Sequence, residues 1–303
     1  MKGIFTGTGA ADFFHTSFCK EGYCLPSSQK GGPSLRGSAG FLLEELILLD
    51  VSWGAFDYFR ENPQAISKLQ AILITHSHED HFLPPVVAFL AEQKLKVSKK
   101  QLKLMGNHTV VAAMKFYLEH KVEQDIIMVQ SETKPLLELY QLVPFEWINF
   151  DSFKILPLPA NHAVFYSWQN IYPQFMKYLQ DKWPLEGPLL FKQEDAFNYL
   201  IGYNQKKMFY GLDSAWPLPE TMAVLKQHHL DLAILDATFG FREPLPGHMN
   251  FEILVRLVGE LGLAERAIAS HLSLHWVPPH SESEVWLGER KIKLAYDGMR
   301  VSS

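Results

Sequence analysis

The run Thr75-His76-Ser77-His78-Glu79-Asp80-His81 constrains the fold more than any other part of the sequence. It follows the apolar residues 71–74, which predict a short buried strand that ends where the polar residues begin. His76 and His78 face the same way in extended or turn geometry, while Asp80 and His81 reach a neighbouring point from the turn. One segment can therefore supply two adjacent metal positions, and its imidazole and carboxylate groups suit zinc, manganese or iron. A histidine-rich surface turn is the alternative, and the density of ligand types disfavours it.

Length and composition set the scale of the fold. The 303 residues, 47% of them hydrophobic, can bury a large core as one domain or as two similar halves. A formal charge of −5 without a long basic block gives no support for broad nucleic-acid affinity, although a local basic patch stays open. We expect a cytoplasmic protein, because the chain starts without a long apolar segment and no later stretch would span a membrane. The two cysteines, Cys19 and Cys24, fit a reducing compartment better than a disulfide.

Apolar runs with strand-like and helix-like patterns alternate along the chain. Strands are predicted at 40–50, 71–74, 102–105, 139–150, 153–158, 197–203, 207–212, 232–235 and 267–269. Helices are predicted at 65–69, 84–95, 109–120, 218–227 and 251–261. Strands in both halves with helices between them favour two sheets packed face to face under outer helices, with a doubly wound sheet as the alternative.

The run at residues 75–81, together with residues further along the chain, resembles the metallo-β-lactamase superfamily. The pattern His76-x-His78-x-Asp80-His81 matches its signature, and Asn161-His162, Asp213 and His271 follow in the expected order, each after a predicted strand. The resemblance covers nearly the whole chain. It implies an α+β fold, the αββα sandwich of two packed mixed sheets flanked by helices, in a single domain over 1–303. Residues 294–299 resemble the final strand and turn of the superfamily, so we expect the domain to be complete.

The resemblance also implies a site for two divalent metal ions, zinc or manganese, with iron as an alternative. His76, His78 and His162 would hold the first ion, Asp80, His81 and His271 the second, and Asp213 would bridge them. A lone histidine beside a strand is more often structural, and Asp213 alone could cap a helix at 217–227. The ordered set favours ligands.

The C-terminal part is similar to the phosphodiesterase branch of the superfamily, which includes transfer-RNA 3′-processing endonucleases and cyclic phosphate phosphodiesterases. The similarity rests on Leu235-Asp236-Ala237-Thr238-Phe239, Gly247-His248-Met249-Asn250 and Gly7-Thr8-Gly9-Ala10-Ala11. The endonucleases carry His-Glu where this chain has Leu235-Asp236, which disfavours transfer-RNA processing. Glyoxalase-like thioesterases and many lactonases have Gly-Gly after the signature, where this chain continues Phe82-Leu83-Pro84-Pro85.

These residues predict a dinuclear metal-dependent hydrolase, a phosphodiesterase for a small or nucleotide-like phosphate ester. The ions would lower the pKa of a bridging water and present hydroxide to phosphorus, with Asp80 and Asp213 orienting it. His248 is the first candidate to protonate the leaving alkoxide, and a histidine that caps the helix at 251–261 or supports a ligand is the alternative. A lactone or other acyl-ester hydrolase is the second enzyme hypothesis. A non-catalytic metal-binding or ligand-sensing protein is the hypothesis of another class.

Substrate contacts are predicted mainly in residues 163–195, an aromatic-rich insertion or lid. Phe165, Tyr166 and Trp168 are the predicted contacts, while the other aromatic residues there are expected to pack a helix onto the core. His275 is a weaker candidate. We expect the partner to be a small-molecule phosphate ester and expect no binding to a membrane or to nucleic acid. A homodimer is a further alternative for the oligomeric state.

Cys19 and Cys24 resemble part of the N-terminal structural zinc cluster of some cyclic phosphate phosphodiesterases. His15 lies nearby in the sequence, and a tetrahedral site would need a further ligand such as His275. We expect a vestigial or unused site.

Overall fold

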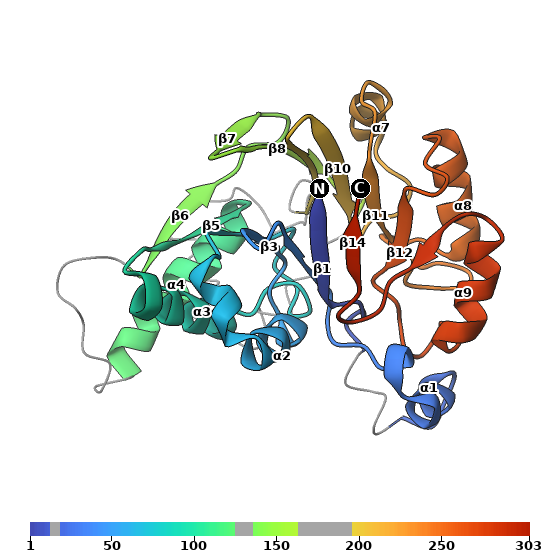
Figure 1. Cartoon of the computed structure of the whole chain (residues 1–303), viewed down its shortest axis with the longest axis horizontal. Helices are drawn as coiled ribbons and strands as arrows, with labels where there is room; N and C mark the ends of the chain where they lie inside the picture. The colour runs from blue at the N-terminus through green and yellow to red at the C-terminus, as the bar shows by residue number, and fades with distance from the viewer. Residues whose placement is uncertain (13–18, 125–135, 163–195) are drawn as a thin grey trace, which may run out of the picture.

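Two mixed β-sheets face each other in the computed structural model, which describes residues 1–12, 19–124, 136–162 and 196–303 (Figure 1). The strands of the first sheet are β1 (Lys2–Gly7), β2 (Gly40–Leu43), β3 (Ile47–Leu49), β4 (Ala71–Leu73), β5 (Leu102–Gly106), β6 (Leu137–Gln141) and β14 (Arg300–Ser302). Those of the second are β7 (Ile148–Phe150), β8 (Phe153–Pro159), β9 (Phe197–Tyr203), β10 (Lys206–Gly211), β11 (Leu232–Asp236), β12 (Ala267–Ser270) and β13 (Lys293–Leu294). The strand orders are β14-β1-β2-β3-β4-β5-β6 and β13-β12-β11-β10-β9-β8-β7.

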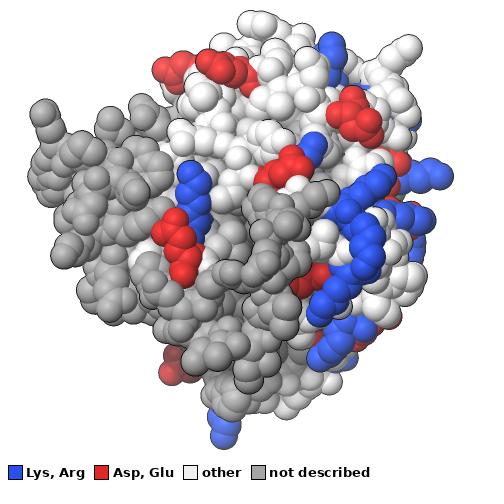
Figure 2. Space-filling view, turned by 90° about the vertical axis from the view of Figure 1, so that its left-hand side faces the viewer, with Lys and Arg blue, Asp and Glu red and all other residues white. Residues whose placement is uncertain are grey.

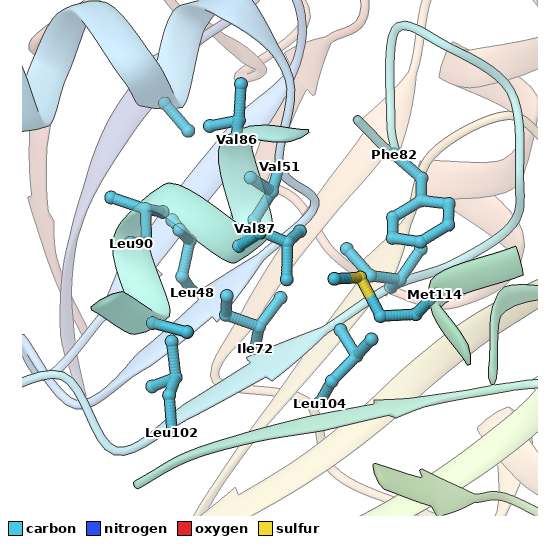
Figure 3. Close-up of a cluster of buried hydrophobic side chains, with 14 of the residues drawn as sticks. Leu48, Val51, Ile72, Phe82, Val86, Val87, Leu90, Leu102, Leu104 and Met114 are labelled. Carbon is cyan, nitrogen blue, oxygen red and sulfur yellow. The ribbon is translucent and has the colours of Figure 1, made fainter. Parts of the chain in front are cut away.

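Helices cover the outer face of each sheet (Figure 1). The α-helices are α1 (Cys24–Lys30), α2 (Trp53–Glu61), α3 (Pro84–Ser98), α4 (His108–Gln124), α7 (Pro219–Lys226), α8 (Phe251–Glu260) and α9 (His280–Gly288), with 3-10 turns η2 (Gly32–Ser34) and η3 (Pro63–Ser67). On the first sheet, Leu48, Ile72 and Leu104 pack against side chains of α3 and α4 such as Leu90 and Met114 (Figure 3). On the second sheet, a separate cluster joins β10–β12 to α7, α8 and α9.

A third apolar layer fills the space between the sheets. Phe41 and Leu73 from the first sheet meet Ile155, Tyr199 and Ile234 from the second, all at most 1% exposed. Each central strand is therefore buried on both faces, which explains its nearly continuous apolar sequence. The predicted αββα sandwich is confirmed, and the doubly wound alternative is wrong.

Two of the predicted strands are each divided by a turn. Glu44 and Glu45 have φ angles of 51° and 60°, which make the tight hairpin between β2 and β3 within 40–50. Residues 139–150 were expected to be one strand, yet β6 and β7 belong to different sheets. Pro144, which has no N–H to donate, and Phe145 at φ 64° lie where the chain crosses over.

Further differences concern short or weakly patterned elements. The helix predicted at 65–69 is the 3-10 turn η3, and β1, α1, α2 and α9 were not predicted. β1 contains Gly3 and Gly7, which weaken a strand pattern, but Phe41 and the Ser38 carbonyl leave no room for a side chain there.

The direction of the strands decides where chemistry can occur. β3, β4, β5 and β6 are parallel, and β10, β11, β12 and β13 are parallel. β8 runs in the direction of β10, because β9 is antiparallel to both. Thus the segments after β4, β8, β10 and β12 leave the strands at their carboxyl ends.

None of the helices in the described ranges is long and apolar enough to cross a membrane.

Candidate metal centre

Four segments at the carboxyl ends of strands supply the side chains of the site. Residues 76–81 follow β4, while His162, Asp213 and His271 follow β8, β10 and β12. Asp213 and His271 have φ angles of 45° and 58°, a left-handed conformation that turns the chain sharply after the strand. That conformation is unfavourable for residues other than glycine and is concentrated at functional sites.

The seven residues that the resemblance implies as ligands form two groups. Within each group, one ligand atom of every residue lies within 4.8 Å of the others. One group holds His76, His78, His162 and Asp213, and the other holds Asp80, His81, Asp213 and His271.

Asp213 faces the two groups with different oxygens. Its Oδ2 lies 3.3 Å from His76 Nε2 and 3.5 Å from His162 Nε2. Its Oδ1 lies 2.8 Å from His271 Nε2 and 3.4 Å from His81 Nε2. Asp213 therefore belongs to both groups, and its two oxygens would be available to two different ions.

The donor set fits two divalent cations. His81 Nε2 and His271 Nε2 lie 3.0 Å apart, and His162 Nε2 lies 3.3 Å from His78 Nδ1. Two of the buried atoms, His76 Nε2 and Asp213 Oδ1, have no hydrogen-bond partner in the described part of the chain. Buried nitrogen and oxygen atoms that face one another in this way are suited to hold a borderline metal ion.

Hydrogen bonds fix the imidazole rings. His81 Nδ1 donates to Asp50 Oδ2 at 2.8 Å, and His162 Nδ1 donates to the Gly247 carbonyl at 3.1 Å. His271 Nδ1 donates to Thr238 Oγ1 at 2.8 Å. With Nδ1 as the donor, each ring in its neutral form would present the lone pair of Nε2 toward the centre.

Asp50 was not found from the sequence. It follows β3 with a φ angle of 58° and is fully buried. Besides His81, it accepts hydrogen bonds from Thr75 N and Oγ1 at 2.8 and 2.9 Å and from Tyr210 Oη at 3.2 Å. The sequence offered one signal for it, a lone aspartate at the end of an apolar run. The strand that it follows, β3, pairs with β4, which leads into the predicted metal segment.

Burial and charge adjust the protonation of the centre. Burial, together with His81 and His78, holds the pKa of His76 well below its ordinary value. Burial likewise lowers the pKa of His162 to about 4. Burial would raise the pKa of Asp213, but the neighbouring charges, His271 and His81 foremost, hold it well below the usual range. Neutral imidazole and charged carboxylate are the metal-binding forms.

His248 lies beside this centre and forms a pair with Asp236. Its Nδ1 donates to Asp236 Oδ2 at 3.1 Å and lies 3.8 Å from Asp213 Oδ1. Its Nε2 has no hydrogen-bond partner among the described residues. Burial alone would lower the pKa of His248, but the carboxylates of Asp213 and Asp236 raise it above the ordinary value.

The structure contradicts two alternatives, namely that His248 caps the helix at 251–261 and that Asp213 caps the helix at 217–227. Asn250 caps α8, with its side chain accepting from Ile253 N at 2.9 Å. α7 starts at Pro219 with Leu218 as the capping residue, so Asp213 caps no helix. Asp236, first noted only as a departure from the endonuclease pattern, holds His248 in place and accepts from the backbone N of Met249 at 2.8 Å.

Comparison with known proteins agrees with this geometry. The family model of the beta-lactamase superfamily domain matches residues 46–272, well over half of the chain. The chain belongs to this superfamily. It is a superfamily of metallo-hydrolases, and the matched range includes all seven predicted ligands.

Several solved structures of the superfamily share the fold. A diphosphatase of the PhnP family is 18% identical with a TM-score of 0.69, covering 100% of this chain and 97% of its own. Zinc-bound PqqB from Methylobacterium extorquens is 13% identical with a TM-score of 0.70 and 100% coverage of both chains. Human short-form tRNase Z is 17% identical with a TM-score of 0.61, covering 100% and 99%. At these identities the likeness shows the fold, and comparison with curated proteins gives no match.

A pocket of about 290 Å³ opens onto the candidate metal centre. Its lining includes Asp80, Asp213, His248 and His271 together with Asp12 and Trp276. Its volume is at the small end of the range for ligand pockets.

His275 is not among the residues that line this pocket. Its Nδ1 lies 3.6 Å from the Sγ atoms of both Cys19 and Cys24. The prediction that His275 contacts substrate therefore gains no support, while the distant residue that the two cysteines needed is present. The three donors are one fewer than structural zinc uses, and within the described ranges no fourth joins them. The expectation of an unused site stays untested.

The remaining predicted contacts, Phe165, Tyr166 and Trp168, lie outside the described residues, as does the whole proposed insertion at 163–195.

Proposed function

We propose that this protein is a dinuclear metal-dependent phosphodiesterase that acts on a small or nucleotide-like phosphate ester. The observation that carries the proposal is the position of His248. A histidine held by Asp236, whose Nε2 has no partner among the described residues, lines the same pocket as Asp213.

The chain's own residues have separate tasks in this proposal. Asp213 and Asp80 face the centre from two segments and would orient the attacking water. Two divalent ions, zinc or manganese, would lower the pKa of that water and offset charge on the phosphoryl oxygens. His248 carries a proton more readily than an ordinary histidine because of its two carboxylate neighbours. It would donate that proton to the leaving alkoxide, or bind a phosphoryl oxygen.

The structural neighbours are compatible with this substrate class. By their names the diphosphatase acts on a diphosphate and the tRNase on a transfer RNA, both of which contain phosphorus–oxygen bonds to be cleaved, and PqqB is described as zinc-bound. The small volume of the pocket favours a small ester over a folded nucleic acid.

A lactone or other acyl-ester hydrolase is the second candidate, because the same centre would serve attack on a carbonyl carbon. A proton donor would assist the departure of an unactivated alkoxide in either reaction, so the Asp236–His248 pair is compatible with both. Turnover of a phosphate ester and of an acyl ester distinguishes the two candidates.

The test is turnover of a bis-aryl phosphate and of an aryl ester by protein loaded with zinc or with manganese. We expect phosphodiester turnover that Asp213→Ala abolishes, which also excludes a contaminating enzyme. Turnover of the aryl ester alone would contradict the proposal. Full metal loading without turnover of either compound would favour a binding or sensing protein.

A further inference from the structure

A lysine-lined groove lies at the end of the molecule opposite the metal centre. It has a volume of about 850 Å³ and is formed by the segment before β4, the end of α3, the start of β5 and the turn between β7 and β8. These are the amino ends of the strands whose carboxyl ends carry the metal ligands. Five lysines line it: Lys68, Lys94, Lys99, Lys100 and Lys103.

Lys94 is the informative member of this group. It continues the buried face of α3 formed by Val87, Leu90 and Ala91, at a position where an apolar residue is expected. Its exposure is only 3%. Burying an ammonium group is unfavourable unless an opposite charge compensates it.

The described residues provide no such charge for Lys94. Its Nζ donates to the Ser67 carbonyl at 2.7 Å, which uses one of three donors, and no described carboxylate lies within 4 Å. Burial and the charge of Lys100 lower its pKa. Lys94 is thus a largely buried cation that lines the groove and has no counter-charge among the described residues.

The neighbouring lysines add to this excess. Lys99 and Lys100 are exposed and have no ion-pair partner in the described ranges. Lys103 lies 3.9 Å from Glu138 and 5.3 Å from the Phe150 ring centre, while Lys68 pairs with Glu45 at 2.5 Å. Figure 2 views the end of the molecule that carries α3, α4 and β6, and shows Lys and Arg side chains gathered along its right side.

We propose that this groove binds a small anion that carries two or more phosphate groups. The volume is within the usual range for small-molecule sites, and several lysines on different elements match several phosphates. A compact group of lysines around a space of this size suits a small polyanion, while the chain as a whole carries a formal charge of −5 and has no long basic block for a nucleic acid. The site does not depend on the proposed phosphodiesterase activity.

Inorganic pyrophosphate is the probe, titrated by calorimetry at low ionic strength. Phosphate groups could also bind the metal centre, so the titration is made with wild type and with Asp213→Ala, which removes the shared ligand. We expect one pyrophosphate to bind Asp213→Ala. Adding Lys94→Met, which keeps the length of the side chain, should weaken this binding about tenfold or more. Lys96→Met in the same background is the matched control, because Lys96 is exposed on the same helix and outside the groove, and should leave the affinity unchanged.

Two further measurements keep the proposal falsifiable. If Lys94→Met fails to fold, the exposed pair Lys99→Ala/Lys100→Ala should lower the affinity about fivefold. Absence of pyrophosphate binding by Asp213→Ala, or equal affinity with and without Lys94, would overturn the proposal. So would a single-stranded oligonucleotide that binds through Lys94 more tightly than pyrophosphate, because the ligand would then be a nucleic acid.

Discussion

The two ends of the β-strands carry opposite unsatisfied charge. At the carboxyl ends, buried imidazole and carboxylate groups face one another, and His76 Nε2 and Asp213 Oδ1 have no hydrogen-bond partner among the described residues. At the amino ends, the ammonium of Lys94 is buried without a counter-charge from the described part of the chain. A buried polar group that the chain leaves uncompensated thus indicates the sign of the ligand. One end is built for cations and the other for an anion.

The largest expected effect breaks the metal end alone. Asp213→Ala should lower phosphodiester turnover by more than about four orders of magnitude, because the ions supply most of the shift in the pKa of water. It should also lower the content of both ions, while His162→Ala should lower the content of one. Metal content by plasma emission spectrometry and turnover of a bis-aryl phosphate check this. Equal metal loss in both variants would contradict a bridging role for Asp213.

Replacing His248 should lower turnover without removing metal. His248→Ala should cost about 10²–10⁴-fold in turnover, the usual range for general acid catalysis. His229→Ala is the control, since His229 is exposed on the protein surface. A loss of metal in His248→Ala would show that His248 is a ligand instead.

The pH profile tests how Asp236 acts through His248. An acid with a raised pKa stays protonated to higher pH, so turnover should persist on the alkaline side. Asp236→Asn removes one of the two carboxylates that raise this pKa. The alkaline limb should then move to lower pH, whereas a merely structural role for Asp236 would lower turnover equally at every pH.

The structure brings the seven predicted ligands together, and the sequence could select them because their spacing is local or because each follows an apolar strand. His76 to His81 form one continuous pattern, and order along the chain then selected His162, Asp213 and His271. Asp50 and Asp236 were missed as supporting residues, because a single aspartate after a strand looks like any turn residue. The prediction that His275 contacts substrate gains no such support. Its nearness to His271 in sequence suggested the pocket, yet the backbone carries it to the two cysteines.

The fold shows the same division between local and distant information. Apolar periodicity was enough for the central strands and for α3, α4, α7 and α8. It could not show that 139–150 divides between two sheets, because the two halves are equally apolar and only the turn at Pro144 and Phe145 separates them. Lys94 was overlooked for a related reason: a lysine in a helix is ordinarily solvent-exposed, and its burial depends on Ser67 and on the end of α3.

Asp50→Asn should weaken metal binding without removing any ligand. Asp50 fixes His81 through Nδ1, and the loss of such a support typically lowers metal affinity about 10–100-fold. Asp57→Asn is the control, on the exposed side of α2. Competition with a chromogenic chelator measures the affinity, and an unchanged value for Asp50→Asn would show that the ring of His81 is held by packing alone.

The smallest expected effect concerns the stability of the groove end. Lys94→Met removes a buried charge and one hydrogen bond, so the free energy of unfolding should change by on the order of 1 kcal/mol. The difference should depend on pH. Because burial lowers the pKa of Lys94, the folded protein releases this proton before the unfolded chain, whose lysines titrate at about 10.4. Wild type should therefore gain stability relative to Lys94→Met as the pH rises toward that value, with the cost of the charge fully present at neutral pH. Urea unfolding at neutral and alkaline pH measures this difference, and Lys96→Met should show none.

A saturating polyanion should make wild type more stable than Lys94→Met at neutral pH, because it stabilises wild type through Lys94 and leaves the variant unchanged. A pH-independent difference would mean that Lys94 is already compensated, and the contrast between the two ends of the strands would then be lost.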